Sequence, residues 1–481
     1  MTPARPGGAA GPAADRRPRV AYLSYSSGEF DARTRRMARW AVSAGYDVVV
    51  YARLERGLPA EEERDGYRIV RVPWHLFALF PVLGLPRRAK RKAGSLLRRI
   101  ARRARRILGR NPDRPAAAPP VARGVPAGPA SPAGRTAGLV GTIAGVRRMV
   151  VAFPVRPLVW HRALEAVAEP ADIWHGMWAG SLPASTGLAR RLGGRAIYDS
   201  RDVYMESRDF SRAPGIVKAA LSRAERHWVS RTDRVLTVNA PYADLLARQL
   251  RIPPPPVVMN CPERWTPPVP RPDRFREALG LGPEVQIVAY QGLLITERGV
   301  EQTIAAMEDV PGAALVLLGW GKDQPAFERI AGAQPFRDRV FFLPPVPVDE
   351  LLYWTASADV SVMAIQPTTV NHRFTTPQKL FESLAAGTPV VASDLPGMAT
   401  IVRDAGVGVL VEPTSPSAIA AGINEILGAS WDDRQRLRAA ALRAAHERYS
   451  WEAQLATLRE LYESLLPASL RPGADTGADG G

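Results

Sequence analysis

The chain has 481 residues, a formal net charge of +17, 46% hydrophobic residues and one cysteine. This length allows two or three domains with sizeable cores, and the apolar content excludes a wholly disordered chain. A single cysteine, Cys261, excludes an internal disulfide and a cluster of cysteine metal ligands, and it fits a reducing compartment.

The positive charge is concentrated in one segment. Residues 87–110 hold twelve Lys and Arg residues and no acid, so the remainder of the chain carries only +5. A strongly basic protein often binds nucleic acid through a surface shared by its domains. Here the basicity belongs to one segment, so we expect no nucleic-acid partner.

The first elements predict a Rossmann-like domain. Residues 1–18 are rich in Pro, Ala, Gly and Arg, lack the apolar run of a signal peptide and are predicted to be a disordered tail. A buried strand (20–24), a polar loop, a helix (31–44) and a second strand (47–52) follow. This order is Rossmann-like but lacks the glycine fingerprint of a dinucleotide site.

An insert, residues 76–137, then interrupts the domain. Residues 74–83 are apolar and aromatic but too short to span a bilayer, residues 87–110 combine an apolar helical stripe with arginines, and residues 111–137 form a Pro/Ala/Gly-rich linker. An aromatic run beside a basic amphipathic helix is typical of an interfacial anchor. We therefore expect residues 74–110 to contact an anionic membrane surface. The alternative is a core segment followed by a solvated helix.

A proline-rich linker separates two β/α units. Pro253–Pro256 and Pro262–Pro272 place the domain boundary near residue 263, which predicts domains over 19–262 and 263–450 and a mobile tail over 469–481. The further predicted elements are strands 196–199, 234–238 and 257–260 and helices 183–192, 214–230, 241–250, 431–449 and 451–466.

The segment Thr375–Asp394 carries the clearest functional pattern. It predicts a Thr cap, a Pro in the first turn, about three turns of helix, a Gly stop and a buried strand. A helix start favours a phosphate group, Lys379 adds a cation, and Glu382 lies on nearly the same face. These groups suit a diphosphate and a ribose. An ordinary capped helix before a strand would show the same spacing.

This segment resembles the donor-site signature of glycosyltransferase family 4, the retaining nucleotide-sugar transferases of the GT-B architecture. Other segments resemble the family in the same order, over roughly residues 19–75 and 165–466; they are Tyr290–Gly292, Glu297–Gly299, Leu315–Gly321, Phe342–Pro345 and Asp349–Leu352. The resemblance implies an α/β fold with two Rossmann-like domains facing a cleft and a last helix, 451–468, that crosses back to the first domain.

The resemblance also implies roles for individual residues. Glu382 matches the second carboxylate of the family's Glu-x7-Glu motif, which binds the ribose. Arg298, Lys379 and the backbone N–H groups around Thr375 and Thr376 are the candidates for the diphosphate. The alternative for Arg298 and Lys379 is a solvated helix face.

Three candidates lie in the first domain. Gly28 would let the backbone approach the donor. Residues 199–206 resemble the family's Tyr-Asp-Ser-His-Glu segment, which makes Glu206 a catalytic candidate, although a surface loop is the alternative. His175 is the second catalytic candidate, because it matches one histidine of the family's His-x-His pair.

Three positions depart from the family pattern. Phe374 stands where the first glutamate of Glu-x7-Glu would fall, Leu293 where an arginine often follows the first strand of the second domain, and Met177 where the second histidine would fall. The sequence does not decide whether these changes reduce activity or alter the preferred donor, and His372 and Arg373 are possible substitutes.

These patterns predict a retaining glycosyltransferase. It would move a sugar from a nucleotide-diphosphate donor to a lipid-linked or other glycan acceptor in cell-envelope or polysaccharide biosynthesis, in the cytoplasm at the inner face of the membrane. The chain has no Asp-x-Asp motif and no histidine spacing for a metal, so we expect no metal and no cofactor. The alternatives are a catalytically weakened relative that acts as a scaffold in glycan assembly and a GT-B epimerase. The donor's base and sugar, the acceptor, the linkage and the oligomeric state stay open.

Overall fold

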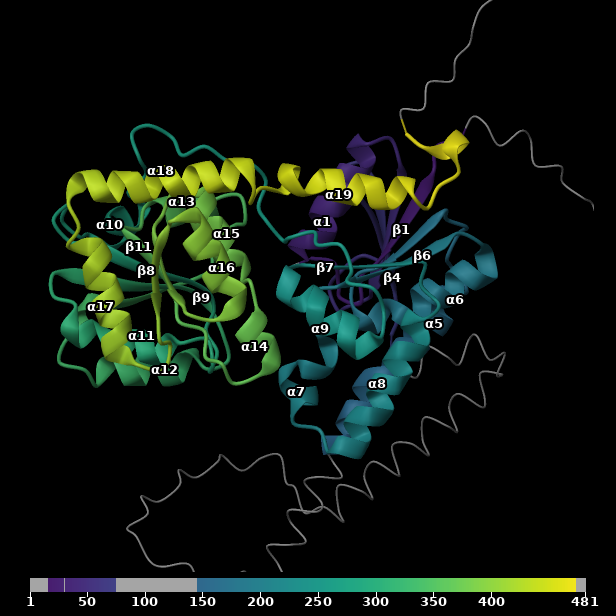
Figure 1. The fold of residues 1–481 in the computed structure, drawn as a ribbon, viewed down its shortest axis with the longest axis horizontal. Helices are drawn as coiled ribbons and strands as arrows, with labels where there is room; N and C mark the ends of the chain where they lie inside the picture. The colour runs from purple at the N-terminus through teal and green to yellow at the C-terminus, as the bar shows by residue number, and fades with distance from the viewer. Residues whose placement is uncertain (1–15, 30, 75–144, 473–481) are drawn as a thin grey trace, which may run out of the picture.

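The computed structural model describes residues 16–29, 31–74 and 145–472, which form two α/β domains side by side (Figure 1). Nearly all of the insert and of the membrane anchor predicted over 74–110 lies outside the described residues. Within the described ranges, no helix is both long and apolar enough to cross a membrane.

The first domain is built on a seven-stranded sheet of order β3-β4-β2-β1-β5-β6-β7, in which only β3 pairs in the antiparallel sense. The strands are β1 (Arg19–Leu23), β2 (Asp47–Arg53), β3 (Glu61–Arg64), β4 (Tyr67–Val72), β5 (Ile173–Gly176), β6 (Arg195–Ser200) and β7 (Arg234–Thr237). The helices are α1 (Ala32–Ser43), α5 (Arg156–Leu164), α6 (Leu182–Leu192), α7 (Arg208–Ser211), α8 (Gly215–Val229) and α9 (Ala240–Leu250), with short helical turns η2 (Val151–Val155), η3 (Ala179–Ser181) and η4 (Tyr204–Glu206).

The apolar run of β1 reflects its central place in this sheet. Val20 to Leu23 are fully buried because strands flank β1 on both sides and helices cover both faces of the sheet. The core on one face includes residues of α1, and the core on the other includes residues of α5 and α6. The predicted β-α-β opening is confirmed, whereas β3, β4 and β5 were not predicted.

The second domain is built on a six-stranded parallel sheet of order β10-β9-β8-β11-β12-β13. Its strands are β8 (Gln286–Leu293), β9 (Ala313–Trp320), β10 (Val340–Leu343), β11 (Val360–Met363), β12 (Val390–Ser393) and β13 (Gly408–Val411). Its helices are α10 (Arg274–Leu279), α11 (Val300–Ala306), α12 (Gln324–Gly332), α13 (Leu351–Ala356), α14 (Val370–Phe374), α15 (Gln378–Ala385), α16 (Pro396–Ala405), α17 (Pro416–Leu427) and α18 (Trp431–Glu447), with turns η5 (Met307–Asp309) and η6 (Arg337–Arg339).

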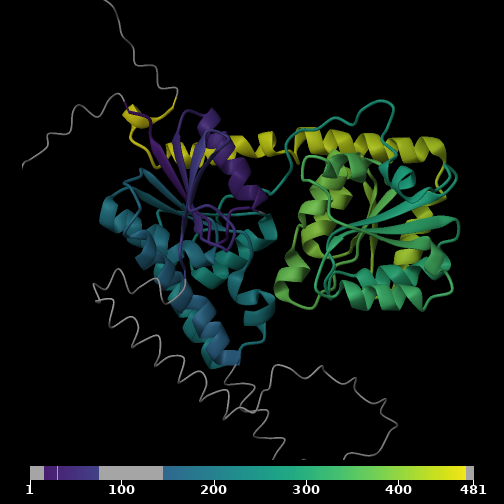
Figure 2. The same cartoon turned by 180° about the vertical axis from the view of Figure 1, so that it is seen from behind.

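The chain passes between the domains twice. After α18, helix α19 (Trp451–Glu463) returns to the first domain, where Trp451, Leu458 and Tyr462 join its core; a short turn, η7 (Ala468–Leu470), follows. Both helices run along one edge of the molecule in Figures 1 and 2. The Trp451 N–H donates to the Pro262 carbonyl over 2.7 Å, so the two crossings lie side by side.

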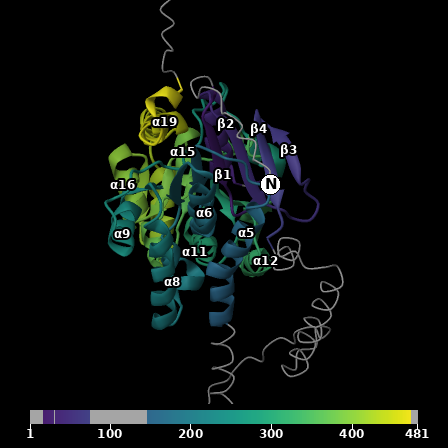
Figure 3. The same cartoon turned by 90° about the vertical axis from the view of Figure 1, so that its right-hand side faces the viewer.

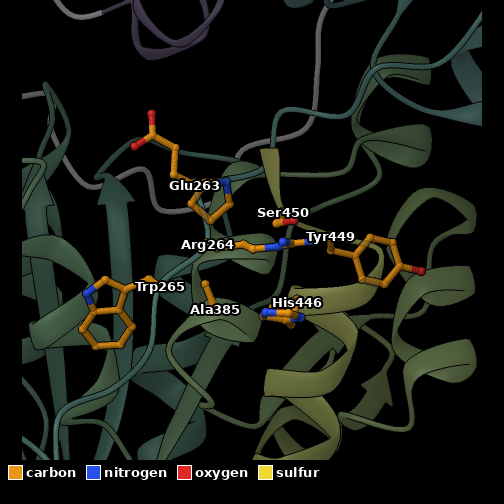
Figure 4. A pocket seen from close by; sticks show the side chains of 9 residues that line it. Glu263, Arg264, Trp265, Ala385, His446, Tyr449 and Ser450 are labelled. Atoms are coloured by element: carbon orange, nitrogen blue, oxygen red, sulfur yellow. The ribbon is translucent and has the colours of Figure 1, made fainter. Parts of the chain in front are cut away.

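A shallow pocket marks this double crossing (Figure 4). The linker supplies Glu263, Arg264 and Trp265, and the end of α18 and the residues after it supply His446 and Tyr449. The Trp265 ring packs edge-to-face on Tyr353 of the second domain, with ring centroids 5.2 Å apart. The linker therefore packs onto the second domain near the crossing.

Candidate donor site between the domains

The segment before α15 is extended rather than helical. Thr375 and Pro377 have ψ angles of 145° and 144°, and α15 begins only at Gln378, without a side-chain cap. The predicted Thr cap and a Pro inside the first turn are therefore wrong. The helix is also shorter than three turns, because Ala386 ends it and Gly387 takes a positive φ of +65°. The predicted glycine stop and the buried strand, β12, are confirmed.

Glu382 is a buried carboxylate held by two amides. Its side chain lies on α15 below the end of β8, and the residue is only 8% exposed. Gln291 donates its side-chain N–H to Oε2 over 2.8 Å, and Gln378 donates to Oε1 over 2.9 Å. Burial raises the pKa of Glu382, and both amides oppose this shift. Because Thr355 donates to the Gln291 oxygen over 2.7 Å, the orientation of this carboxylate is fixed.

Lys379 is a cation with an unused donor. Its Nζ lies 3.5 Å from the centroid of the Tyr290 ring, which attracts a cation through its π face. The buried Nζ has no hydrogen-bond partner within the part of the chain that the structure describes. Burial and the neighbouring Arg298 lower the pKa of Lys379 well below its usual value, while Glu382 raises it. An anion at this point would add the missing partner.

The two threonines before α15 are tied to the first domain. Asn239 donates its side-chain amide to Thr376 Oγ1 over 3.1 Å and to the Phe374 carbonyl over 2.9 Å. The Thr376 hydroxyl is therefore engaged across the domain boundary. The expected role of the backbone N–H groups of Thr375 and Thr376 in phosphate binding stays a prediction.

Gly28 lies in the loop after β1 and has a φ of +85°. This conformation favours glycine, and a Cβ at this position would lie 3.6 Å from Ala52 Cβ. The Gly28 N–H donates to Ser26 Oγ over 3.2 Å, which holds the loop. The backbone requirement explains the glycine, while its contact with a donor stays a prediction.

His175 lies in the core of the first domain. It is 0% exposed, and its Nδ1 is 2.7 Å from the Tyr462 hydroxyl of α19. Burial lowers its pKa to about 3, which keeps the ring neutral. A side chain sealed beneath the returning helix cannot reach a substrate. We therefore do not retain His175 as a catalytic candidate and assign it to the attachment of α19.

Glu206 is bound within its own domain. Its Oε1 is 2.8 Å from Lys218 Nζ and accepts a hydrogen bond from Gln249 over 3.2 Å. The carboxylate thus links η4 to α8 and α9. These partners give Glu206 a structural role, and its catalytic role stays a prediction without support from these contacts.

The departures from the family pattern lie in three different environments. Met177 is 1% exposed and belongs to the core below α1, whereas Leu293 is 44% exposed at the end of β8. Phe374 packs against an apolar cluster of the first domain. Leu293 is thus exposed, whereas the buried Met177 and the partly buried Phe374 serve packing.

Several functional contacts were not predicted. Gln291 and Gln378 hold Glu382, and Asn239 holds the segment before α15. Gln291 and Asn239 reach partners that are distant in sequence, so no local spacing signals these contacts, whereas Gln378 and Glu382 are only four residues apart on α15. Among the described residues, no group of three or more His, Cys, Asp or Glu side chains is arranged to hold a metal ion.

Most of the second domain matches a known family. Residues 272–444 match the family described as "Glycosyl transferases group 1". The chain is also 30% identical over 269 residues to D-inositol 3-phosphate glycosyltransferase from Xylanimonas cellulosilytica. That match covers 52% of this chain and 62% of the relative, so the chain spans less than two thirds of the relative's length.

Two solved structures show the fold. Sucrose-phosphate synthase from Thermosynechococcus elongatus superposes with a TM-score of 0.65 at 18% identity, over 93% of this chain and 99% of that protein. Anabaena HepE, solved in complex with UDP, has a TM-score of 0.61 at 14% identity, over 93% of this chain and 100% of that protein. The predicted two-domain GT-B fold is therefore confirmed.

Proposed function

We propose that this chain, whose residues 272–444 match the glycosyl transferases group 1 family, is a retaining glycosyltransferase that uses a nucleotide-diphosphate sugar. The observation that carries the proposal is Lys379, a buried amine without a hydrogen-bond partner within the described residues, which lies beside Arg298 and over Tyr290. A diphosphate supplies the negative charge that these cations lack. The start of α15 adds a favourable dipole.

The proposed chemistry depends on charge and position. As the bond to the sugar breaks, negative charge grows on the leaving diphosphate, and Lys379 and Arg298 are placed to stabilise it. Glu382 binds ribose hydroxyls in this proposal, in place of its amide contact to Gln378.

The acceptor we propose is a lipid-linked or other glycan, in cell-envelope or polysaccharide biosynthesis. The relative named D-inositol 3-phosphate glycosyltransferase carries a phosphate-bearing compound in its name, which supports an acceptor that also carries phosphate. The basic segment within residues 74–110 supports a site next to an anionic membrane.

A scaffold without catalysis is the second candidate, and Phe374 is the observation that favours it. This side chain contacts the first domain instead of offering a carboxylate to a donor sugar. A protein that had lost catalysis would have no need to keep both Glu382 and the unpaired Lys379. We therefore favour the enzyme.

A thermal-shift screen against UDP-, GDP-, ADP- and TDP-sugars tests the proposal. A ligand that binds only the folded state raises the melting temperature by mass action, so at least one donor should give a rise. That donor should then be consumed when membrane lipid extract is added. Absence of any shift at millimolar donor would contradict the enzyme and support the scaffold.

A further inference from the structure

The segment 371–376 connects the two domains. Asn371 Oδ1 accepts a hydrogen bond from the backbone N–H of Val203 over 3.0 Å, and the Asn371 carbonyl accepts one from the Tyr242 hydroxyl over 2.9 Å. Asn371 is 6% exposed and Tyr242 is 1% exposed, so water does not compete freely for these bonds. A loop and a helix of the first domain, at Val203 and at Tyr242 of α9, therefore both bind one residue of the second.

Asn239 makes a second contact across the domain boundary, beginning three residues after Asn371 in the segment. Its amide nitrogen donates to the Phe374 carbonyl over 2.9 Å and to Thr376 Oγ1 over 3.1 Å, while its oxygen accepts from the Tyr242 N–H over 2.7 Å as the cap of α9. The side chain is 3% exposed, and both donor positions are used across the boundary. One asparagine thus caps a first-domain helix and binds a second-domain segment.

The Phe374 side chain adds an apolar contact between the two domains at the same place. It packs against the first-domain cluster that includes Tyr204, Tyr242 and Leu246. A glutamate here would bring a charge against an apolar cluster, which is unfavourable. On the other side of the segment, a Cβ at Gly397 would come within 2.3 Å of the Thr375 carbonyl oxygen, so α16 supports the backbone closely. In Figure 3, α9 and α16 lie on the same side of the molecule.

This contact leads directly into the donor site. Only Pro377 separates Thr376 from α15, whose first turns carry Lys379 and Glu382. The first domain also reaches α15 by a second path, because Arg36 contacts Asn260, and Asn260 donates to Gln378 over 3.2 Å. The start of α15 is therefore held by first-domain side chains at two points.

We propose that residues 371–376 and Asn239 form an interdomain clasp, which holds the start of α15 in its donor-binding position before any donor arrives. Asn239 and Phe374 are then positioning residues for the donor. The role in donor binding rests on the proposed function, but the contact between the domains can be measured without a donor. Phe374, in place of a carboxylate for the sugar, stabilises the contact between the two domains.

Asn239→Asp is the sharpest variant. Aspartate keeps the oxygen that caps α9 but removes both donors, and its charge repels the Phe374 carbonyl. We expect the radius of gyration from small-angle X-ray scattering to increase without donor. We also expect the dissociation constant of the best-binding nucleoside diphosphate to rise about tenfold, a loss of about 1.4 kcal/mol. Asn424→Asp is the control, because Asn424 donates to the Asp309 carbonyl within the second domain over 2.7 Å.

Phe374→Glu separates the clasp from a simpler explanation. If Phe374 has only replaced a glutamate that would contact the donor sugar, Phe374→Glu should tighten donor binding and leave the radius of gyration unchanged. The clasp predicts the opposite: an open molecule and weaker binding, with Phe374→Leu close to the unchanged protein because it keeps apolar contact.

The outcomes distinguish the two proposals. A larger radius of gyration in Asn239→Asp and Phe374→Glu supports the clasp, whether or not the unchanged protein binds a nucleotide. Failure of the unchanged protein to bind any nucleotide would contradict the proposed function instead. Unchanged scattering with unchanged affinity in Asn239→Asp overturns the clasp. A lower melting temperature alone, with scattering and affinity like those of Asn424→Asp, assigns Asn239 to helix capping and also overturns it.

Discussion

The strand ends and the helices that follow them hold paired charges in the first domain and, within the described part of the chain, a cation without a hydrogen-bond partner in the second. In the first domain, the charged groups form ion pairs: Arg33 pairs with Asp199 at 2.7 Å, with both side chains at most 1% exposed, and Arg201 pairs with Asp31 at 2.7 Å, although its buried Nε has no hydrogen-bond partner among the described residues. In the second domain, the buried Nζ of Lys379 has no hydrogen-bond partner of any kind among the described residues.

This difference separates structural charge from charge available to a ligand. Both regions carry basic and acidic residues at strand ends or in the helix that follows. The Arg33 side chain also donates to the Val258 carbonyl over 2.8 Å, so its donors are spent within the domain. Lys379 has donors left over. The expected effects of mutation differ accordingly.

The largest effect on stability should come from Arg33→Met. Removing one partner of a fully buried pair leaves Asp199 charged and without its counter-ion, which costs about 3–5 kcal/mol of unfolding free energy. Urea denaturation measures this loss. Arg162→Gln is the matched control, since its ion pair with Glu165 is exposed on the arginine side and should be worth less than about 1 kcal/mol. Equal losses of unfolding free energy in the two variants would mean that the buried pair stabilises the fold no more than the exposed pair.

Lys379→Met should have effects of opposite sign on stability and on binding. Burial and Arg298 lower the pKa of Lys379 in the folded protein, so the unfolded chain binds more protons between that lowered pKa and the ordinary value of about 10.4. Across this window the stability of the unchanged protein rises with pH. Methionine removes this dependence and should raise the melting temperature most at the low-pH end.

The same variant should bind a nucleoside diphosphate at least about tenfold more weakly, because a charge-assisted bond of about 1.5–3 kcal/mol is lost. Calorimetry at two pH values, with melting curves alongside, measures both effects. A variant that is less stable and binds as before would mean that Lys379 serves packing only.

Glu382→Gln should weaken nucleoside diphosphate binding by about tenfold with a smaller effect on the fold. Glutamine keeps the shape but removes the negative charge, and its N–H₂ group then faces the N–H₂ group of Gln291 or Gln378. The diphosphate contacts remain, so we expect a smaller loss than for Lys379→Met. Equal binding of a nucleoside diphosphate and of inorganic pyrophosphate by the unchanged protein would contradict the role of Glu382 with ribose.

The sequence predicted features that depend on local spacing. The β-α-β opening, the glycine stop after α15 and the neighbouring placement of Lys379 and Glu382 all follow from residues close together in the chain, whereas β3, β4 and β5 were missed and the predicted strand 257–260 is only an isolated bridge at Val257. The sequence could not predict pairing over long distances. His175 was predicted to be catalytic, yet α19, nearly 300 residues later, covers it through Tyr462, whose hydroxyl is 287 positions away in sequence. Asn239 and Gln291 gain their roles in the same way, from partners brought near by folding.

The smallest expected effect is that of metal removal. Lys379, Arg298 and the start of α15 supply positive charge to a diphosphate through protein groups alone, so a divalent ion has no necessary place in the proposed site. Transfer rates measured with and without EDTA should therefore agree within error, while Lys379→Met loses activity under both conditions. Activity that disappears in EDTA and returns with magnesium or manganese would show that Lys379 and Arg298 do not suffice to stabilise the leaving diphosphate. The charge on Lys379 would then act on the diphosphate together with a bound metal ion.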